Sequence, residues 1–273
     1  MRKLKRTVLA TCVLGVVGAV ALSNSWAAQN RQTARGPEAY LSNADVQAIR
    51  RAELRDDDTG VGFRFTNNLI RRFVESKQGM ELRDFSRGTD LQKALYIIRN
   101  TDDPDLLNDL VIRNDPASMR VWRQNVQPIV LQGCASAGCH GGTEPVGGLQ
   151  LYRNAQNENV AYTNFYNLAT FEQEVEGEGM FGGGMKKMID RQRPIDSLLL
   201  QYSLPANVAD TPHPKPPGGQ DIAMFRSTND QRFRAIGLWI EQGLVPMDNK
   251  GYDVEFAMPG QGSTTTPSTQ PAE

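Results

Sequence analysis

Apolar residues recur at helical spacing along the first part of the chain. Three runs repeat them at the three- and four-residue intervals of an amphipathic helix: residues 43–54, 69–74 and 91–98. Ser42-Asn43-Ala44-Asp45 has the capping-box pattern that starts a helix. Asp103-Pro104 and Asp115-Pro116 each place a capping carboxylate before a first-turn proline. The pattern therefore predicts a small helical unit over residues 28–115, with a further helix starting at its end.

From residue 116 the pattern changes. A helix with Met119, Trp122 and Val126 on one face runs toward two cysteines, and we expect Pro128 to kink it. A glycine- and asparagine-rich stretch follows over residues 141–184, and then a short helix over residues 193–200. After a proline-dense loop over residues 205–219, a last helix over residues 229–244 is capped by Asn229 or Asp230. The chain as a whole is expected to be all-α, with a second helical domain over residues 116–250.

The sequence predicts that both ends of the chain lie outside the folded domains. Basic residues between Arg2 and Arg6 precede an apolar run from Val8 to Leu22, and Ser25-Trp26-Ala27 offers small side chains to a signal peptidase. Residues 1–27 are therefore predicted to be a signal peptide, which makes the protein periplasmic or otherwise exported. An uncleaved anchor is the alternative. Residues 251–273 have the low complexity of a disordered polar tail.

Charge narrows the range of partners. The chain has 30 basic and 31 acidic residues. Loss of the signal peptide removes four basic residues and leaves 26 against 31, a formal net charge of −5. An acidic mature protein argues against nucleic acid as a partner. It also argues against a polybasic membrane patch, so we expect no strong membrane association after cleavage.

The cysteines carry the main chemical signal. Cys12 leaves with the signal peptide, so the mature chain keeps Cys134 and Cys139, in Cys134-Ala-Ser-Ala-Gly-Cys139-His140. A c-type haem needs two thiols for its vinyl groups and an imidazole directly after the second thiol. The usual spacing has two residues between the thiols, whereas this chain has four small ones. Gly141-Gly142 then lets the backbone pass close to a flat cofactor.

Other readings of this motif stay open. A Cys134–Cys139 disulfide is compatible with an exported protein. A zinc site would be short of ligands, because the chain has one histidine besides His140. An iron–sulfur cluster normally uses four cysteines. The residues favour one covalent haem c, with His140 as the proximal iron ligand.

Several ordered segments around this motif resemble the planctomycete-type cytochrome c domain. They are Val126-Gln127-Pro128-Ile129, Cys139-His140-Gly141-Gly142, Gly147-Gly148-Leu149-Gln150-Leu151, Asp196-Ser197-Leu198-Leu199, Lys215-Pro216-Pro217-Gly218 and Ala235-Ile236-Gly237-Leu238-Trp239-Ile240-Glu241-Gln242-Gly243. The resemblance spans about residues 120–245. It implies a cytochrome c-like helical fold in which Trp239 and Ile240 pack against the helix around Trp122 and Val126.

The second axial ligand departs from that family. Its members present Met-Pro-Pro where this chain has Lys215-Pro216-Pro217, so the expected methionine is missing. His213 stands two residues earlier between two prolines, which stiffen its loop. We therefore predict His213 as the distal iron ligand. The alternatives are open: Met185, Met188, Met224 or no sixth ligand.

These features favour an exported monohaem electron carrier over a catalyst. Its expected partner is a redox protein in the same compartment. A haem peroxidase or gas sensor would need an open sixth position, against which a distal His213 argues. A non-haem binding protein with a Cys134–Cys139 disulfide is the third reading.

Overall fold

The computed structural model describes residues 40–66, 68–175, 183–216, 219, 221–247, 251–254 and 256. The predicted signal peptide lies outside these residues, and so does most of the predicted tail. Within the described ranges, no helix is long and apolar enough to cross a membrane.

The first helix confirms its sequence signal. In α2 (Asn43–Ala52) the Ser42 hydroxyl accepts a hydrogen bond from the backbone N–H of Asp45, and the Asp45 carboxylate accepts one from the backbone N–H of Ser42. This reciprocal pair satisfies two backbone donors that a helix start otherwise leaves unpaired. The capping box predicted at Ser42 is therefore confirmed.

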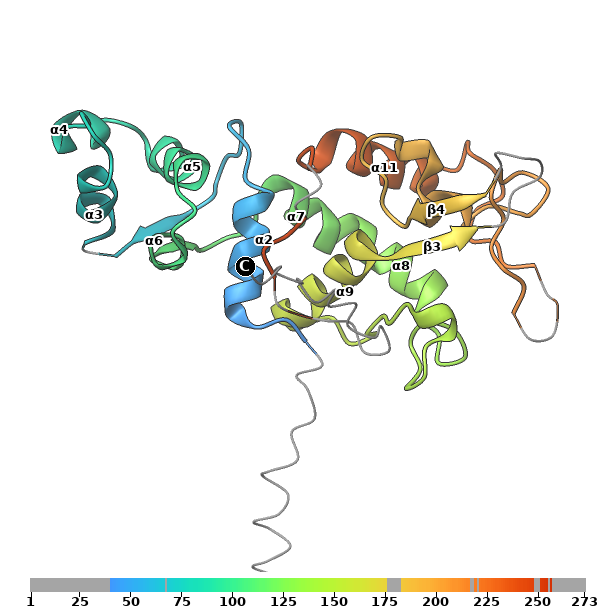
Figure 1. Cartoon of the computed structure of the whole chain (residues 1–273). Helices are drawn as coiled ribbons and strands as arrows, with labels where there is room; N and C mark the ends of the chain where they lie inside the picture. The colour runs from blue at the N-terminus through green and yellow to red at the C-terminus, as the bar shows by residue number, and fades with distance from the viewer. Residues whose placement is uncertain are drawn as a thin grey trace, which may run out of the picture. The chain divides into compact units, whose positions relative to one another are not determined.

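A first hydrophobic core joins four helices and a strand pair. The helices are α3 (Leu69–Glu75), α4 (Leu82–Phe85), α5 (Asp90–Asn100) and α6 (Pro104–Asn108), and they lie together in Figure 1. Phe73, Leu95 and Ile97 are among their buried side chains. Asp103 caps α6 and Pro104 occupies its first turn, as the sequence predicts.

The expectation of an all-α fold is wrong. Strand β1 (Phe63–Phe65) pairs antiparallel with β2 (Leu110–Ile112), and β3 (Glu172–Val175) pairs antiparallel with β4 (Gly184–Lys187). The described fold is mixed α/β with small sheets. Leu110, a few residues after the helix start predicted at Pro104, pairs with Phe65 in the first sheet. Strands of three or four residues are too short for alternation to be visible in sequence.

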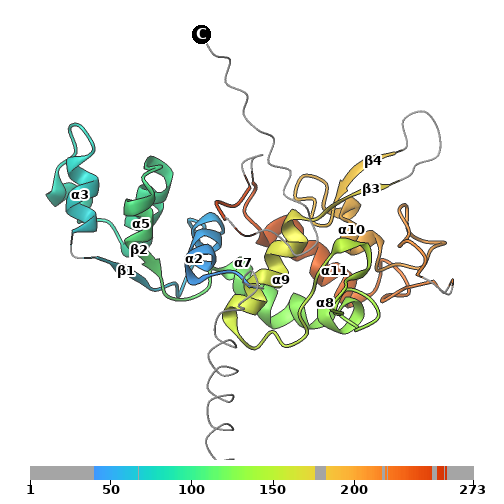
Figure 2. The same cartoon turned by 60° about the horizontal axis from the view of Figure 1, so that its bottom comes forward.

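A second, larger core lies under the cysteine motif. It contains α7 (Ala117–Val121), α8 (Gln127–Cys134), α9 (Glu158–Thr170), α10 (Leu198–Gln201) and α11 (Gln231–Leu238), with π-helical turns at Trp122–Val126 and Trp239–Gly243 and 3₁₀ turns at Val146–Gly148 and Pro194–Asp196. Figure 2 shows these helices with the β3–β4 pair. Three residues of the α2 region, Leu41, Val46 and Ile49, also pack into this core.

The packing expected of the first and last helices is confirmed. The indole rings of Trp122 and Trp239 stack with centroids 5.5 Å apart. Both indole N–H groups donate to buried carbonyls, Trp122 to Ala161 at 3.0 Å and Trp239 to Ser118 at 3.0 Å. Pro128 lies at the start of α8, directly after a π-helical turn, so the irregularity precedes the proline.

Helix α9 is the main element that the sequence pattern does not reveal. It occupies part of the glycine- and asparagine-rich stretch. Its buried residues surround the helix: Val160, Ala161, Tyr162, Thr163, Asn164, Phe165, Asn167 and Leu168. A helix enclosed on most sides has no solvent-exposed face, so its polar and apolar residues do not alternate with the period of an amphipathic helix.

Buried ion pairs connect α2 to this core. The Arg50 guanidinium donates to the Asp115 carboxylate at 2.7 Å and to Glu158 at 2.6 Å. Tyr162 donates its hydroxyl to the same Asp115 at 2.9 Å. Asp115 therefore does not cap the following helix, which begins at Ala117 after Pro116. The helix start was predicted correctly but the role of Asp115 was not.

A second polar cluster connects α2 to the C-terminal segment. Buried Glu53 accepts from Arg191 at 2.8 Å and from the Tyr252 hydroxyl at 2.5 Å. Its other oxygen accepts from the backbone N–H of Val245 at 3.1 Å. Tyr252, within the segment predicted as tail, is thus held in the core.

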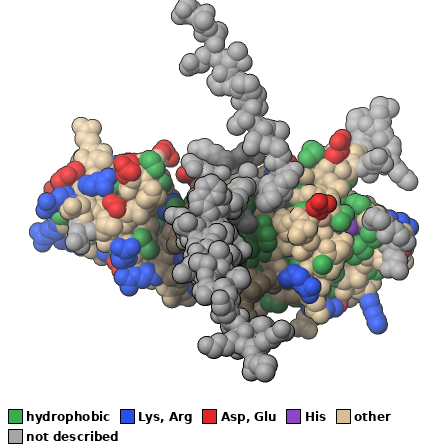
Figure 3. Space-filling model, turned by 90° about the horizontal axis from the view of Figure 1, so that it is seen from below, with side chains coloured by type: hydrophobic (Ala, Val, Ile, Leu, Met, Phe, Trp, Pro, Cys, Tyr) green, Lys and Arg blue, Asp and Glu red, His purple; other side chains and the backbone are tan. Residues whose placement is uncertain are grey.

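Basic and acidic side chains are interspersed on the face that Figure 3 shows.

Candidate haem site

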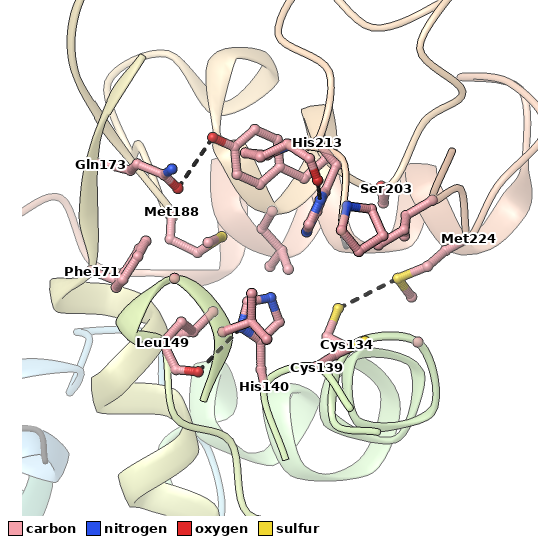
Figure 4. A pocket seen from close by; sticks show the side chains of 18 of the residues that line it. Cys134, Cys139, His140, Leu149, Phe171, Gln173, Met188, Ser203, His213 and Met224 are labelled. Carbon is pink, nitrogen blue, oxygen red and sulfur yellow. Dashed lines mark hydrogen bonds between the residues drawn. The ribbon is translucent and has the colours of Figure 1, made fainter. Parts of the chain in front are cut away.

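One cavity of about 370 Å³ gathers the predicted site residues. Cys134, Cys139, His140 and His213 all line it, together with mainly apolar side chains such as Leu149 and Phe171. This size and mainly apolar lining are typical of cofactor pockets. Figure 4 shows the two imidazoles in the middle of the cavity and the cysteines to one side of them.

A tight turn after α8 presents the cysteine motif. Helix α8 ends at Cys134, whose carbonyl accepts from the backbone N–H of His140 at 3.2 Å. The backbone carbonyl of Ser136 accepts hydrogen bonds from the backbone N–H groups of Cys139 and Gly141 at 3.0 and 2.9 Å. The four small residues between the thiols thus fold into a compact loop. A side chain at Gly141 would meet the Ala135 carbonyl oxygen at 2.1 Å, so this approach needs glycine.

The hydrogen bonding of His140 suits a metal ligand that binds through Nε2. Its Nδ1 lies 3.2 Å from the carbonyl oxygen of Leu149. A hydrogen bond of this kind fixes the tautomer and leaves Nε2 unprotonated, as in most metal-binding histidines. Burial, and then the neighbouring His213, hold the pKa of His140 below its ordinary value. The neutral imidazole that a metal requires is therefore favoured.

His213 reaches the cavity from a loop that α10 anchors. Gln201, buried at the end of α10, accepts from the backbone N–H groups of Asp210 and Thr211 at 2.8 and 3.3 Å. The Tyr202 ring packs edge-on against the His213 ring, with centroids 5.0 Å apart. Nδ1 of His213 lies 2.7 Å from the Pro214 carbonyl oxygen, so this imidazole too keeps Nε2 for another ligand.

The two imidazoles face each other at a distance suited to one metal ion between them. Their ring centroids are 6.1 Å apart, and the rings point toward one another in Figure 4. Two imidazoles on opposite sides of one metal have centroids roughly 6 Å apart, because each metal–nitrogen bond is about 2 Å long. The residues present therefore fit a haem whose iron His140 and His213 would hold between them. Sequence spacing alone does not bring these two residues together.

The two cysteines are free thiols in the structure. Burial and the neighbouring Cys139 raise the pKa of the Cys134 thiol to about 12. The Met224 sulfur lies 3.6 Å from the Cys134 sulfur, at the edge of the cavity. Both thiols border the space beside the imidazoles, which is where thioether bonds to one flat cofactor would form.

The three alternative methionines differ in position. Met185 lies on β4 and is 62% exposed, outside the cavity lining. Met188 is buried and lines the cavity near Phe171. Met224 packs against Gly133 and Cys134. Met188 and Met224 border the cavity, and His213 is the residue that faces His140.

Sequence reasoning missed several residues of the site. Tyr202 and Gln173 line the cavity, and the Tyr202 hydroxyl donates to the Gln173 amide oxygen at 3.3 Å. Gln173 comes from β3, a strand that the pattern does not predict. No spacing motif connects either residue to the cysteines, so the signal exists only in the tertiary structure.

The chain matches no family model, no curated protein and no solved structure. The resemblance to the planctomycete-type cytochrome c domain therefore stays a prediction. The geometry of the cavity is therefore the basis on which a function can be inferred.

Proposed function

We propose that the protein is an exported monohaem c-type cytochrome that transfers single electrons. The observation that carries the proposal is the pair His140 and His213, facing each other at 6.1 Å beside two free thiols in one apolar cavity. Cys134 and Cys139 would hold one haem c covalently. His140 would be its proximal and His213 its distal iron ligand.

Each residue has a defined task in this proposal. A bound haem supplies one-electron chemistry at its iron. The Leu149 and Pro214 carbonyls hold the two imidazoles in the tautomer that leaves Nε2 for the metal. Tyr202 fixes the ring of His213 from the side. With His140 and His213 both binding the metal, no position would be left for a reacting molecule, which suits electron transfer.

The apolar lining serves the same task. Leu149, Phe171 and Met188 border the cavity, so they limit water around a cofactor bound there. Burial of this kind and the choice of axial ligand are two of the means by which a protein sets a haem potential. Histidine in place of methionine as distal ligand favours a lower potential.

Location and partner follow from the sequence rather than from the cavity. The predicted signal peptide supports export to the periplasm or an equivalent compartment, where c-type haem is attached. The proposed partner is a redox protein of that compartment. The formal charge of −5 expected for the mature chain speaks against nucleic acid as a partner.

The test is production in a host with cytochrome c maturation, followed by intact mass and visible spectrum. We expect the mass of the mature chain plus one haem, and the sharp bands of a six-coordinate low-spin c-type haem. The Cys134→Ala/Cys139→Ala variant is the matched control and should carry no covalent haem. A wild-type mass without haem would refute the proposal.

The same preparation separates a carrier from an enzyme or gas sensor. With His213 on the iron, the reduced protein should bind carbon monoxide poorly. Rapid and complete carbon monoxide binding by the wild type would mean an open sixth position. The electron-carrier proposal would then give way to haem-based catalysis or sensing.

A further inference from the structure

The cavity has two chemically different sides. Figure 4 shows Cys134 and Cys139 on one side of the imidazole pair and Gln173 on the other. The Gln173 amide oxygen accepts from the Tyr202 hydroxyl. Among the described residues, the Gln173 amide nitrogen donates no hydrogen bond to another side chain or to the backbone. Polar donors thus lie on the side away from the thiols.

Lys186 adds a positive charge beside Gln173. The two residues are directly paired across the β3–β4 sheet, so their side chains leave the same face. The half-buried Lys186 ammonium donates to the Thr211 hydroxyl at 2.6 Å. Thr211 is itself buried and lies two residues before His213. Lys186 therefore reaches from the hairpin to the loop of the distal ligand.

The Lys186 charge lacks a carboxylate partner among the described residues. Its neighbour Lys187, on the opposite face of the strand, lies 3.8 Å from the Glu172 carboxylate. A half-buried ammonium with no carboxylate beside it would be stabilised by an anion placed next to it. Gln173 lines the cavity and Lys186 lies beside it on the same face of the sheet, so an anion that leaves the cavity at Gln173 would come close to both side chains.

A haem bound through its vinyl carbons brings such anions to this place. Its two propionate groups leave the edge of the ring opposite the vinyl edge. With the vinyl carbons at Cys134 and Cys139, the propionate edge would face the side of the cavity that Gln173 lines. This step rests on the haem function proposed above.

We propose that Lys186 and Gln173 form the haem propionate site of this protein. Lys186 supplies the charge, and the Gln173 amide nitrogen supplies neutral donors. Tyr202 orients Gln173 through its hydroxyl. Lys186 also contacts Thr211, so a bound propionate is connected to the loop that carries the distal ligand. Lys186 is thus a positioning residue and an electrostatic determinant of the potential.

The test compares Lys186→Met with Lys187→Met in the haem-loaded full chain. Loss of the Lys186 charge should reduce the equilibrium constant for haem reduction roughly three- to tenfold, because a nearby cation favours the less positive ferrous form. The propionate should also titrate at higher pH, so the pH range in which the potential changes should move upward. Lys187→Met should change neither quantity.

Two further variants keep the test informative. Lys186→Arg retains the charge and should keep the wild-type potential, whereas Lys186→Gln should act like Lys186→Met if the latter loads poorly. Equal potentials and equal pH profiles for the Lys186 and Lys187 variants would overturn the propionate site. The haem function would stand in that case, because the intact mass reports covalent haem independently.

Discussion

The imidazole rings of His140 and His213 have centroids 6.1 Å apart, although the two residues are 73 positions apart in the chain. Each ring has a backbone carbonyl at Nδ1, from Leu149 and Pro214 respectively. The two rings thus have the same hydrogen-bonding arrangement and face one space. This symmetry is the property from which the function is inferred.

Replacement of His213 tests its role as distal ligand. In haem-loaded His213→Ala the intact mass should still include one haem, because both cysteines and His140 are unchanged. The visible spectrum should become high-spin, and the reduced protein should bind carbon monoxide. His213→Met should restore a low-spin spectrum with a higher potential, since a thioether favours ferrous iron.

Met188→Leu is the matched control for His213. It keeps the volume of a buried side chain in the same cavity, and such exchanges usually cost less than about 1.5 kcal/mol. The spectrum should stay low-spin. A change in Met188→Leu together with an unchanged His213→Ala spectrum would assign the distal position to methionine.

The cysteine loop should tolerate a side chain at one glycine and not at another. A Cβ at Gly141 would lie 2.1 Å from the Ala135 carbonyl oxygen, which is backbone and cannot rotate away. A Cβ at Gly138 would have no neighbouring atom within 4 Å. Gly141→Ala should therefore lower the free energy of unfolding by about 1–3 kcal/mol.

Gly138→Ala should change stability by less than about 0.5 kcal/mol. Denaturant unfolding of both variants under identical conditions measures the difference. Equal stabilities would show that the loop does not hold the backbone as close to Ala135 as the structure has it.

Asp115 should be important for stability because it lies buried between two guanidinium groups. It is 8% exposed and binds Arg50 and Arg123 at 2.7 Å each. Asp115→Asn removes the negative charge and leaves both arginines without it, for which we expect a loss of about 3–5 kcal/mol. Asp56→Asn breaks the exposed Arg99 pair and should have no measurable effect on denaturant unfolding.

The same residue should make stability depend on pH. Burial acts to raise the pKa of Asp115, but the hydrogen bonds from Arg50 and Arg123 outweigh it and hold this pKa below its ordinary value. The stabilisation is thus fully present above the unfolded-state pKa of about 3.9, and is lost as pH falls through the lower folded-state pKa. Below pH 4, wild-type stability should fall more steeply than that of Asp115→Asn.

The hydroxyl of Tyr252 should contribute to holding the C-terminal segment. It donates to the fully buried Glu53 carboxylate, which Arg191 also contacts. Tyr252→Phe removes a hydrogen bond to a buried charge and should cost about 1.5–3 kcal/mol of unfolding free energy. The control is Tyr166→Phe, whose hydroxyl bond to the Phe256 carbonyl is longer, at 3.3 Å. A loss no larger than the control's would speak against this cluster.

Local signals in the sequence were sufficient where the chemistry is local. Ser42 with Asp45, Asp103 with Pro104, and Asp230 all mark helix starts that the structure has. In each case the capping side chain binds a backbone group two or three residues away, so a short stretch of sequence contains the whole interaction.

Sequence patterns gave wrong predictions where a residue distant in sequence determines the contact. Asp115 precedes a helix as a cap would, but Arg50, 65 positions earlier, binds its carboxylate instead. The expectation of an all-α fold failed because β1 and β2 are only three residues long, and their pairing depends on segments far apart in sequence. Helix α9 lacks a solvent-exposed face, so its sequence shows no amphipathic pattern.

For the site, the sequence by itself determined the chemistry of one side. The order Cys134, Cys139, His140 puts two thiols and an imidazole on one short loop, because residues so close in sequence cannot lie far apart. Only the tertiary structure decided what stands opposite. Packing of Tyr202 and the Gln201 anchor place His213 across from His140, and the β3–β4 pairing puts Lys186 beside Gln173, which lines the cavity on the side away from the thiols. Contacts between such distant segments follow from how the whole core packs, which no local pattern of residues contains.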